Sequence, residues 1–321
     1  MNRLACALAA SLAAATLFAG FAGRDPRGSG FAEENFALPL RVMTITAHPD
    51  DSDFECAATA IKLARAGARV HFVAVCNGDN GHQTMKPADL AARRYLETQV
   101  AAKAYGIEKY VVMGEHDCLV EPTLDLRKRI TRMIRAFAPH VIITHRTCDY
   151  HADHRAVAQA VQDATYLLGV PLFCPEAPVP ETLPCVFFAG DTFTVPRPFR
   201  ADMVVIGDDV EDQMVSGWAC HESQVFEWLV PEYGLTLESV PKDAKGRHDW
   251  LKALRRQRGR TARNVQTHSE VLKRINGGRL PYHADVYELS EYGRKPAPKE
   301  IAYLKSLGFH WLKDADIAGV K

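Results

Sequence analysis

Two short clusters of metal-competent side chains lie about a hundred residues apart in the chain. The first is Ala47-His48-Pro49-Asp50-Asp51, and the second runs from His145 to His154 and contains Asp149, His151 and Asp153. Each follows an apolar run, 42–46 or 141–144, that is typical of a buried strand, and each precedes a helical pattern. Because ligands bind outside the carboxyl ends of the strands in an open parallel sheet, we expect the two clusters to converge at one edge.

The residue types in these clusters suit a catalytic divalent ion. Catalytic zinc is held by three protein ligands, usually histidine and carboxylate, and keeps one position open for water. His48, Asp51 and His154 supply such a set. Asp50, next to a ligand, is expected to take a proton from the bound water as the general base. His151 precedes His154 by three residues, which places both on one face of the helix start, and it is expected to face the substrate as an acid.

The carboxylates around His151 have two interpretations. Asp153 is expected to accept the second imidazole proton of His151, which would hold the ring and favour its charged form. Asp149 is the alternative partner for that role. Helix capping explains either carboxylate without any catalytic function. His145 is left outside the metal shell as a strand-end residue.

The two motifs resemble the LmbE/PIG-L family of zinc-dependent N-deacetylases, which includes enzymes like the GlcNAc-PI de-N-acetylase. The resemblance rests on AHPDD at 47–51 and on the His-x-Asp-His segment at 151–154, in the expected order and strand-to-helix context. It implies a zinc-dependent hydrolase of linear amides that removes an acetyl or other acyl group from the nitrogen of an N-acetylated amino sugar or related glycoconjugate. From their family positions, Arg94 and Asp117 are expected to contact substrate hydroxyls.

Other functions remain open at this point. Two histidines and one carboxylate also describe non-haem iron(II) sites, so iron is an alternative to zinc. A non-catalytic carbohydrate-binding protein on the same fold is a further alternative. A dinucleotide-dependent oxidoreductase is disfavoured, because no Gly-x-Gly-x-x-Gly follows the first strand. The sequence does not identify which N-acylated compound is the substrate, nor an oligomeric state.

Strand and helix patterns alternate along the chain from residue 42. Such alternation predicts an α/β fold with a Rossmann-like, doubly wound, mostly parallel sheet, and it places the metal site at the C-terminal edge of the strands. Apolar runs at 186–188 and 203–206 are expected to add strands, and 209–229 is expected to form one amphipathic helix that contains His221. The strands of the first half are predicted at 42–46, 70–76, 110–113 and 141–144, and its helices at 53–66, 88–104, 124–137 and 152–168.

The N-terminal segment predicts export. Residues 1–23 combine an early arginine, an alanine-rich apolar run and small residues near its end, which is typical of a cleaved signal peptide, with an uncleaved membrane anchor as the alternative. Residues 24–39 are expected to be a linker, and 40–321 the deacetylase-like domain with a C-terminal extension from about 240. We therefore expect a periplasmic or secreted protein without stable membrane insertion once the signal is removed.

The overall charge argues against an electrostatic partner. Lys+Arg and Asp+Glu are equal at 39 each, so the formal net charge is zero, and no nucleic-acid partner is expected. The basic stretch 242–263 is interpreted as a solvated helix face, with recognition of an anionic substrate or a nucleic acid as the alternative. The expected partner is a small molecule or glycan that bears an N-acetyl group.

Overall fold

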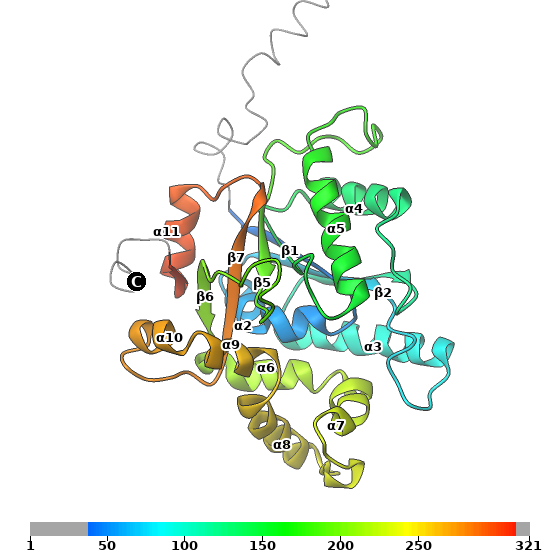
Figure 1. Cartoon of the computed structure of the whole chain (residues 1–321), viewed down its shortest axis with the longest axis vertical. Helices are drawn as coiled ribbons and strands as arrows, with labels where there is room; N and C mark the ends of the chain where they lie inside the picture. The colour runs from blue at the N-terminus through cyan, green and yellow to red at the C-terminus, as the bar shows by residue number, and fades with distance from the viewer. Residues whose placement is uncertain (1–37, 313–321) are drawn as a thin grey trace, which may run out of the picture.

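The computed structural model describes residues 38–312. The predicted signal peptide and nearly all of the predicted linker lie outside that range. The described chain forms one eight-stranded sheet in the order β3-β2-β1-β4-β5-β7-β6-β8, with helices on both faces (Figure 1). The strands are β1 Arg41–Thr46, β2 Arg69–Cys76, β3 Lys109–Glu115, β4 Val141–Thr144, β5 Cys185–Ala189, β6 Met203–Ile206, β7 Ala284–Gly293 and β8 Phe309–Trp311.

The helices alternate with the strands in the first half of the chain and follow one another in the second. They are α2 Asp51–Arg65, α3 Pro87–Tyr105, α4 Leu124–Phe137, α5 Ala152–Leu167, α6 Glu211–Trp218, α7 Leu229–Glu232, α8 Ala244–Gln257, α9 Arg260–Thr267, α10 Ser269–Ile275 and α11 Pro298–Ser306, with short helical turns η1 Asp208–Val210, η2 Ser223–Trp228 and η3 Leu237–Ser239. No helix within residues 38–312 combines the length and the apolar character needed to cross a bilayer.

The predicted doubly wound sheet is confirmed. Strands β3, β2, β1, β4 and β5 run parallel, and β7 joins β5 and β6 in antiparallel pairs. In β1, Val42 packs into the core under α2, α3 and α6, whereas Met43 and Ile45 pack into the core under α4 and α5. This follows from the alternation of side chains along a strand, and Figure 1 shows the two helical layers on opposite sides of the sheet.

The register of β1 and β4 sets the position of the functional residues. Ile45 pairs with Thr144 near the carboxyl end of both strands. The loops that follow, with His48 on one and His145 on the other, therefore leave the sheet at the same edge. This is how segments a hundred residues apart come together.

The second half of the chain departs from the prediction in two respects. The helix expected at 209–229 is broken: α6 ends at Trp218, and Ser223–Trp228 forms a separate π-helical turn. Tertiary hydrogen bonds explain the break, because Trp218 Nε1 donates to the Asp53 carbonyl and His221 Nε2 lies 2.8 Å from Asp53 Oδ1. In addition, the residues after 240 are not an appendage, since β7 inserts between β5 and β6.

Packing of α6 against α3 depends on Gly217, and this predicts a stability effect. A Cβ at this position would lie 2.0 Å from Cε1 of Tyr105, a ring that is buried. Gly217→Ala is expected to lower the free energy of unfolding by about 1–3 kcal/mol through overpacking, although alanine alone favours a helix. Urea unfolding checks this, with the exposed neighbour Ser216→Ala as control. A midpoint for Gly217→Ala at or above the wild-type value would contradict the packing described.

Candidate active site

Two strand-to-helix connections carry the cluster of histidines and aspartates. After β1, the chain turns through His48 and enters α2 at Asp51, with Asp50 at the N-cap position. After β4, it passes His145 and enters α5 with His151 as the N-cap residue, so His154 sits in the first turn. The first residues of α2 and α5 therefore face the same space at the carboxyl edge of the sheet.

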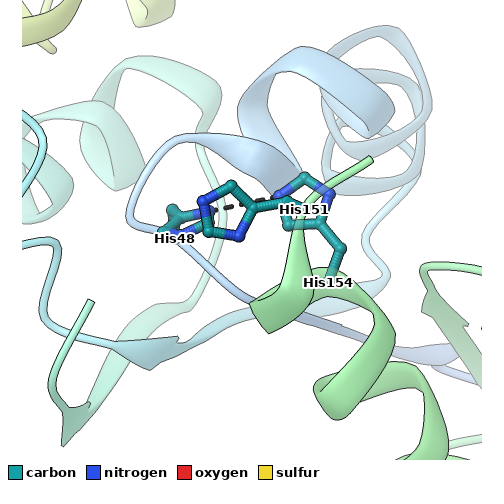
Figure 2. Close-up of side chains that lie close together, drawn as sticks. All are labelled: His48, His151 and His154. Carbon is teal, nitrogen blue, oxygen red and sulfur yellow. Dashed lines mark hydrogen bonds between the residues drawn. The ribbon is translucent and has the colours of Figure 1, made fainter. Parts of the chain in front are cut away.

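Three of the predicted ligand atoms converge. His48 Nδ1 lies 3.2 Å from His154 Nε2 and 3.2 Å from Asp51 Oδ2, and His154 Nε2 lies 3.3 Å from the same Asp51 oxygen. Figure 2 shows the rings of His48 and His154 meeting in this way, with His151 beside them. Bonds of the length zinc makes to nitrogen and oxygen, in a tetrahedron, separate adjacent ligand atoms by about 3.3 Å. The donor types and their separations thus fit one divalent ion.

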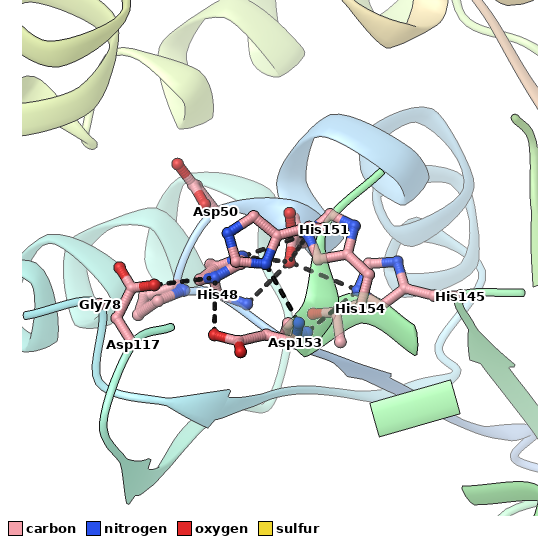
Figure 3. A network of polar contacts seen from close by, with 12 residues as sticks. His48, Asp50, Gly78, Asp117, His145, His151, Asp153 and His154 are labelled. Atoms are coloured by element: carbon pink, nitrogen blue, oxygen red, sulfur yellow. Dashed lines mark hydrogen bonds and ion pairs between the residues drawn. The ribbon is translucent and has the colours of Figure 1, made fainter. Parts of the chain in front are cut away.

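The outward-facing nitrogens of both imidazoles meet carboxylates. His48 Nε2 lies 3.2 Å from Asp117 Oδ1 and 3.4 Å from Asp153 Oδ2 (Figure 3). His154 Nδ1 lies 3.1 Å from Asp149 Oδ1. Burial alone would raise the pKa of Asp117 and Asp149, but the neighbouring imidazoles lower it to about 2 in each. A carboxylate on the second nitrogen of a metal-binding histidine fixes the tautomer and orientation of that ring.

The role expected of Asp153 is therefore corrected. Its carboxylate does not hold His151: it accepts from the backbone N–H groups of Cys118 and Val120 and approaches His48. The alternative, Asp149, likewise approaches a ligand, His154. His151 Nδ1 instead accepts from the backbone N–H of Asp153 at 3.2 Å. Burial, together with the neighbouring His48 and His154, lowers the pKa of His151 and so favours its neutral ring.

Arg94, expected to contact substrate, is placed behind Asp50. Its side chain is buried, with Nη2 3.1 Å from Asp50 Oδ1 and Nη1 donating to the Gly78 carbonyl at 3.2 Å. Gly78 has a φ of +68°, and a Cβ there would lie 2.3 Å from Arg94 Nη1, so only glycine admits the guanidinium this closely. Burial raises the pKa of Asp50 and the charge of Arg94 opposes that rise. Asp117, the other expected substrate contact, meets His48 as described above. Both Arg94 and Asp117 also line the cavity described below, so their contact with substrate stays a prediction.

Three further residues support the site and were not predicted to do so. His145 Nε2 accepts from the Ala47 backbone and lies 3.4 Å from Asp51 Oδ2, and its Nδ1 is 3.2 Å from Glu55 Oε1. That glutamate in turn pairs with Arg260 Nη2 at 3.1 Å. Glu55 lies one helical turn after Asp51, and this spacing, which places both on one face of α2, is a signal present in the sequence. Nothing in the sequence near Arg260 links it to a site two hundred residues earlier.

A cavity of about 810 Å³ opens above the cluster. His48, Asp50, Asp51 and His151 line its inner end. The wall opposite comes from the second half of the chain, including the loop at 190–193 and residues of α7, α8 and α9. Asp153 and His154 are not among the lining residues, which agrees with their burial beneath the floor.

The fold and the cluster together define an α/β domain with a two-histidine, one-carboxylate site at the carboxyl edge of its sheet. Residues 43–165 match the PIG-L family, described as GlcNAc-PI de-N-acetylase, and these residues form a PIG-L family domain. The resemblance inferred from the motifs is thereby confirmed. The chain is also 27% identical over 145 residues to a diacetylchitobiose deacetylase of Thermococcus kodakarensis, over 44% of this chain and 54% of that protein. The chain thus spans about half the length of this relative.

Solved structures share the fold. The N,N'-diacetylchitobiose deacetylase of Pyrococcus horikoshii has a TM-score of 0.58 at 18% identity, covering 80% of this chain and 88% of that one. GalB, the 4-carboxy-2-hydroxymuconate hydratase of Pseudomonas putida KT2440, has a TM-score of 0.57 at 17% identity, covering 80% and 97%. Because a deacetylase and a hydratase share this fold, the fold alone does not determine the reaction.

The contact between Asp149 and His154 predicts an effect on metal affinity. Asp149→Asn keeps the size of the side chain and removes the charge that faces His154 Nδ1. Loss of such an outer contact typically weakens metal binding by about 10- to 100-fold. Competition with a chromophoric chelator measures the zinc dissociation constant, and Asp163→Asn, on the same helix and away from the cavity, is the control. Equal zinc affinity in wild type and Asp149→Asn would show that Asp149 does not support the site.

Proposed function

We propose that this protein is a metal-dependent hydrolase that removes an acyl group, most simply acetyl, from the nitrogen of an N-acylated amino sugar or glycoconjugate. One observation carries the proposal: His48 Nδ1, Asp51 Oδ2 and His154 Nε2 lie within 3.3 Å of one another beside Asp50 at the inner end of a cavity. The PIG-L domain and the deacetylase relative support it. Zinc fits these donors, and so does iron(II).

His48, Asp51 and His154 would hold the ion. When bound, a divalent ion supplies Lewis acidity that makes water nucleophilic near neutral pH and polarises a carbonyl oxygen. Asp50 faces the same space and is not one of the three converging ligands. Arg94 holds its Oδ1, which leaves Oδ2 to receive a proton from the attacking water. The proton held on Asp50 is then available to the departing amine nitrogen.

His151 contributes as a neutral donor in this proposal. Its Nδ1 accepts from the Asp153 backbone, so the ring proton resides on Nε2. His151 lines the cavity, and its ring centroid lies 4.5 Å from that of His48. An N–H donor aimed at the acyl oxygen would stabilise the charge that develops there as water attacks. The charged imidazole of the initial hypothesis is replaced by this neutral form.

The activity test is the release of acetate and free amine from a panel of N-acetylated sugars and glycosides by the metal-loaded protein. Activity should disappear on treatment with a chelator and return with one equivalent of zinc or iron(II). Adding each metal by itself shows which of the two restores activity. A carbohydrate-binding protein would retain affinity for the same sugars and release nothing. An iron oxygenase would consume oxygen.

Export stays a proposal as well. It rests on the sequence of residues 1–23, which lie outside the described range. If it is correct, the substrate belongs to the cell envelope or the surroundings of the cell. Fractionation of cells that produce the full chain, followed by mass measurement of the mature N-terminus, would test both the compartment and the cleavage.

The Asp50→Asn variant tests whether Asp50 acts as the general base or as a metal ligand. The substitution keeps the side chain's shape and removes the proton acceptor, so kcat should fall by about 10²- to 10⁴-fold, the usual contribution of a general base. Metal content should remain near one equivalent, because Asp50 is not among the three converging atoms. Inductively coupled plasma mass spectrometry and the acetate assay measure the two quantities on the same sample. Loss of metal together with activity would make Asp50 a ligand and require another base.

A further inference from the structure

One wall of the cavity is rich in arginine. Helices α8 and α9 and the turn between them place Arg255, Arg260 and Arg263 on this wall. All three belong to the basic stretch that was interpreted as a solvated helix face. That interpretation does not hold for Arg255, which is buried, or for Arg260, which is half-buried, whereas Arg263 is exposed. They lie outside residues 43–165, the segment that matches the PIG-L family.

Most charges around the cavity are compensated within the protein. Arg260 pairs with Glu55, Asp50 with Arg94, and Asp191 with Arg146 at 2.6 Å. Among residues 38–312, two cavity-lining guanidinium groups, those of Arg255 and Arg263, form no ion pair with a carboxylate. Among the same residues, Glu232 is the one cavity-lining carboxylate that forms no ion pair, and it is exposed. The wall therefore carries an excess of positive charge.

Arg255 is held in place without being neutralised. It is 4% exposed, and its guanidinium carbon lies 3.8 Å from the centroid of the Phe54 ring. Its Nη1 donates to the Tyr233 hydroxyl at 3.2 Å, while its Nε has no acceptor among the described residues. Burying an unpaired charge is unfavourable, so the aromatic contacts and one neutral hydrogen bond compensate only part of that cost.

The backbone next to Arg255 is shaped around its guanidinium. Gly259, in the turn between α8 and α9, has a φ of +92°, and a Cβ there would lie 2.4 Å from Arg255 Nη1. Arg263 follows in α9 and is exposed at the same cavity. One fixed guanidinium and one free guanidinium thus share a wall that faces the proposed metal site.

We propose that Arg255 and Arg263 form a subsite for an anionic substituent of the substrate, a carboxylate or a phosphate, so that the preferred substrates are acidic N-acyl amino sugars. Guanidinium groups bind both oxyanions through paired N–H donors, and these charge-assisted bonds are stronger than neutral ones. The inference rests on the proposed function, since it assigns this wall to the substrate of that reaction.

The first test compares acidic with neutral substrates. The values of kcat/KM are measured for N-acetylglucosamine, its 6-phosphate and N-acetylmuramic acid with the full-length, metal-loaded protein. Wild type should prefer at least one acidic sugar, and Arg263→Gln should reduce the acidic-to-neutral ratio by about tenfold or more, the loss expected for one charged hydrogen-bonded contact. Arg263→Lys should retain part of the preference, and Arg274→Gln, which removes an exposed charge outside this cavity, should retain all of it.

The second test measures binding without turnover. Asp50→Asn protein is titrated calorimetrically with glucosamine, glucosamine 6-phosphate and inorganic phosphate, in the presence and absence of the Arg263→Gln change. The subsite is supported if the sugar phosphate binds more tightly than glucosamine and if this difference is lost in Arg263→Gln. Should the protein show this binding but release no acetate, the proposed reaction fails and the subsite stands. If both proteins are active and the acidic-to-neutral ratio of kcat/KM is equal in wild type and Arg263→Gln, the subsite is overturned and the proposed reaction stands. Inorganic phosphate that binds as tightly as the sugar phosphate would overturn its assignment to the substrate.

Discussion

The site depends on the contacts of the Asp51 carboxylate with three histidine rings. Its Oδ2 lies within 3.4 Å of an imidazole nitrogen of His48, His145 and His154 and accepts from the His48 backbone N–H at 2.7 Å. A single buried oxygen can satisfy so many neighbours only when the ends of β1 and β4 are level. The parallel register of these two strands is therefore the geometric condition for the site, and the helices on both faces of the sheet maintain it.

The support for Asp51 extends far beyond the two motifs. The chain of contacts from Asp51 through His145 and Glu55 reaches Arg260, so the start of α9 is connected to the proposed metal ligands. Arg260 also donates to the Gly190 carbonyl, in the loop that lines the cavity. Asp51, His145 and Glu55 are buried and Arg260 is half-buried, and each has an opposite or polar partner, which keeps the cost of burying these groups low. The C-terminal third of the chain thus contributes to the order of the site as well as to the wall of the cavity.

Local patterns in the sequence were sufficient to predict the alternating half of the fold and the convergence of His48, Asp51 and His154. Strand runs such as 141–144 are short and apolar, and a histidine or aspartate directly after such a strand has only one edge of the sheet to occupy. The partners of Asp153, Asp149 and Arg94 were beyond prediction. A carboxylate in the first turn of α5, or in the loop before it, can reach several rings, and a guanidinium can reach several carboxylates, so only the packed structure selects one partner. The break after Trp218 was missed for the same reason: contacts with Asp53, far away in sequence, override the helical periodicity.

The cavity divides along the chain. Its inner end is built by residues of the segment that matches the PIG-L family, where one oxygen and two ring nitrogens must keep separations of about 3.3 Å to suit a metal. Its opposite wall is built by residues from the range 190–264. Of these, Arg260 is linked to Asp51 through Glu55 and His145, whereas Arg263 lies outside that chain of contacts, so a substitution there would leave the proposed metal ligands in place. The positions of side chains are therefore strictly constrained at the inner end of the cavity and less constrained on the opposite wall. If α8 and α9 bind the substrate as proposed, positions of these helices other than Arg260 can change its preferred substrate while the proposed chemistry at β1 and β4 stays the same.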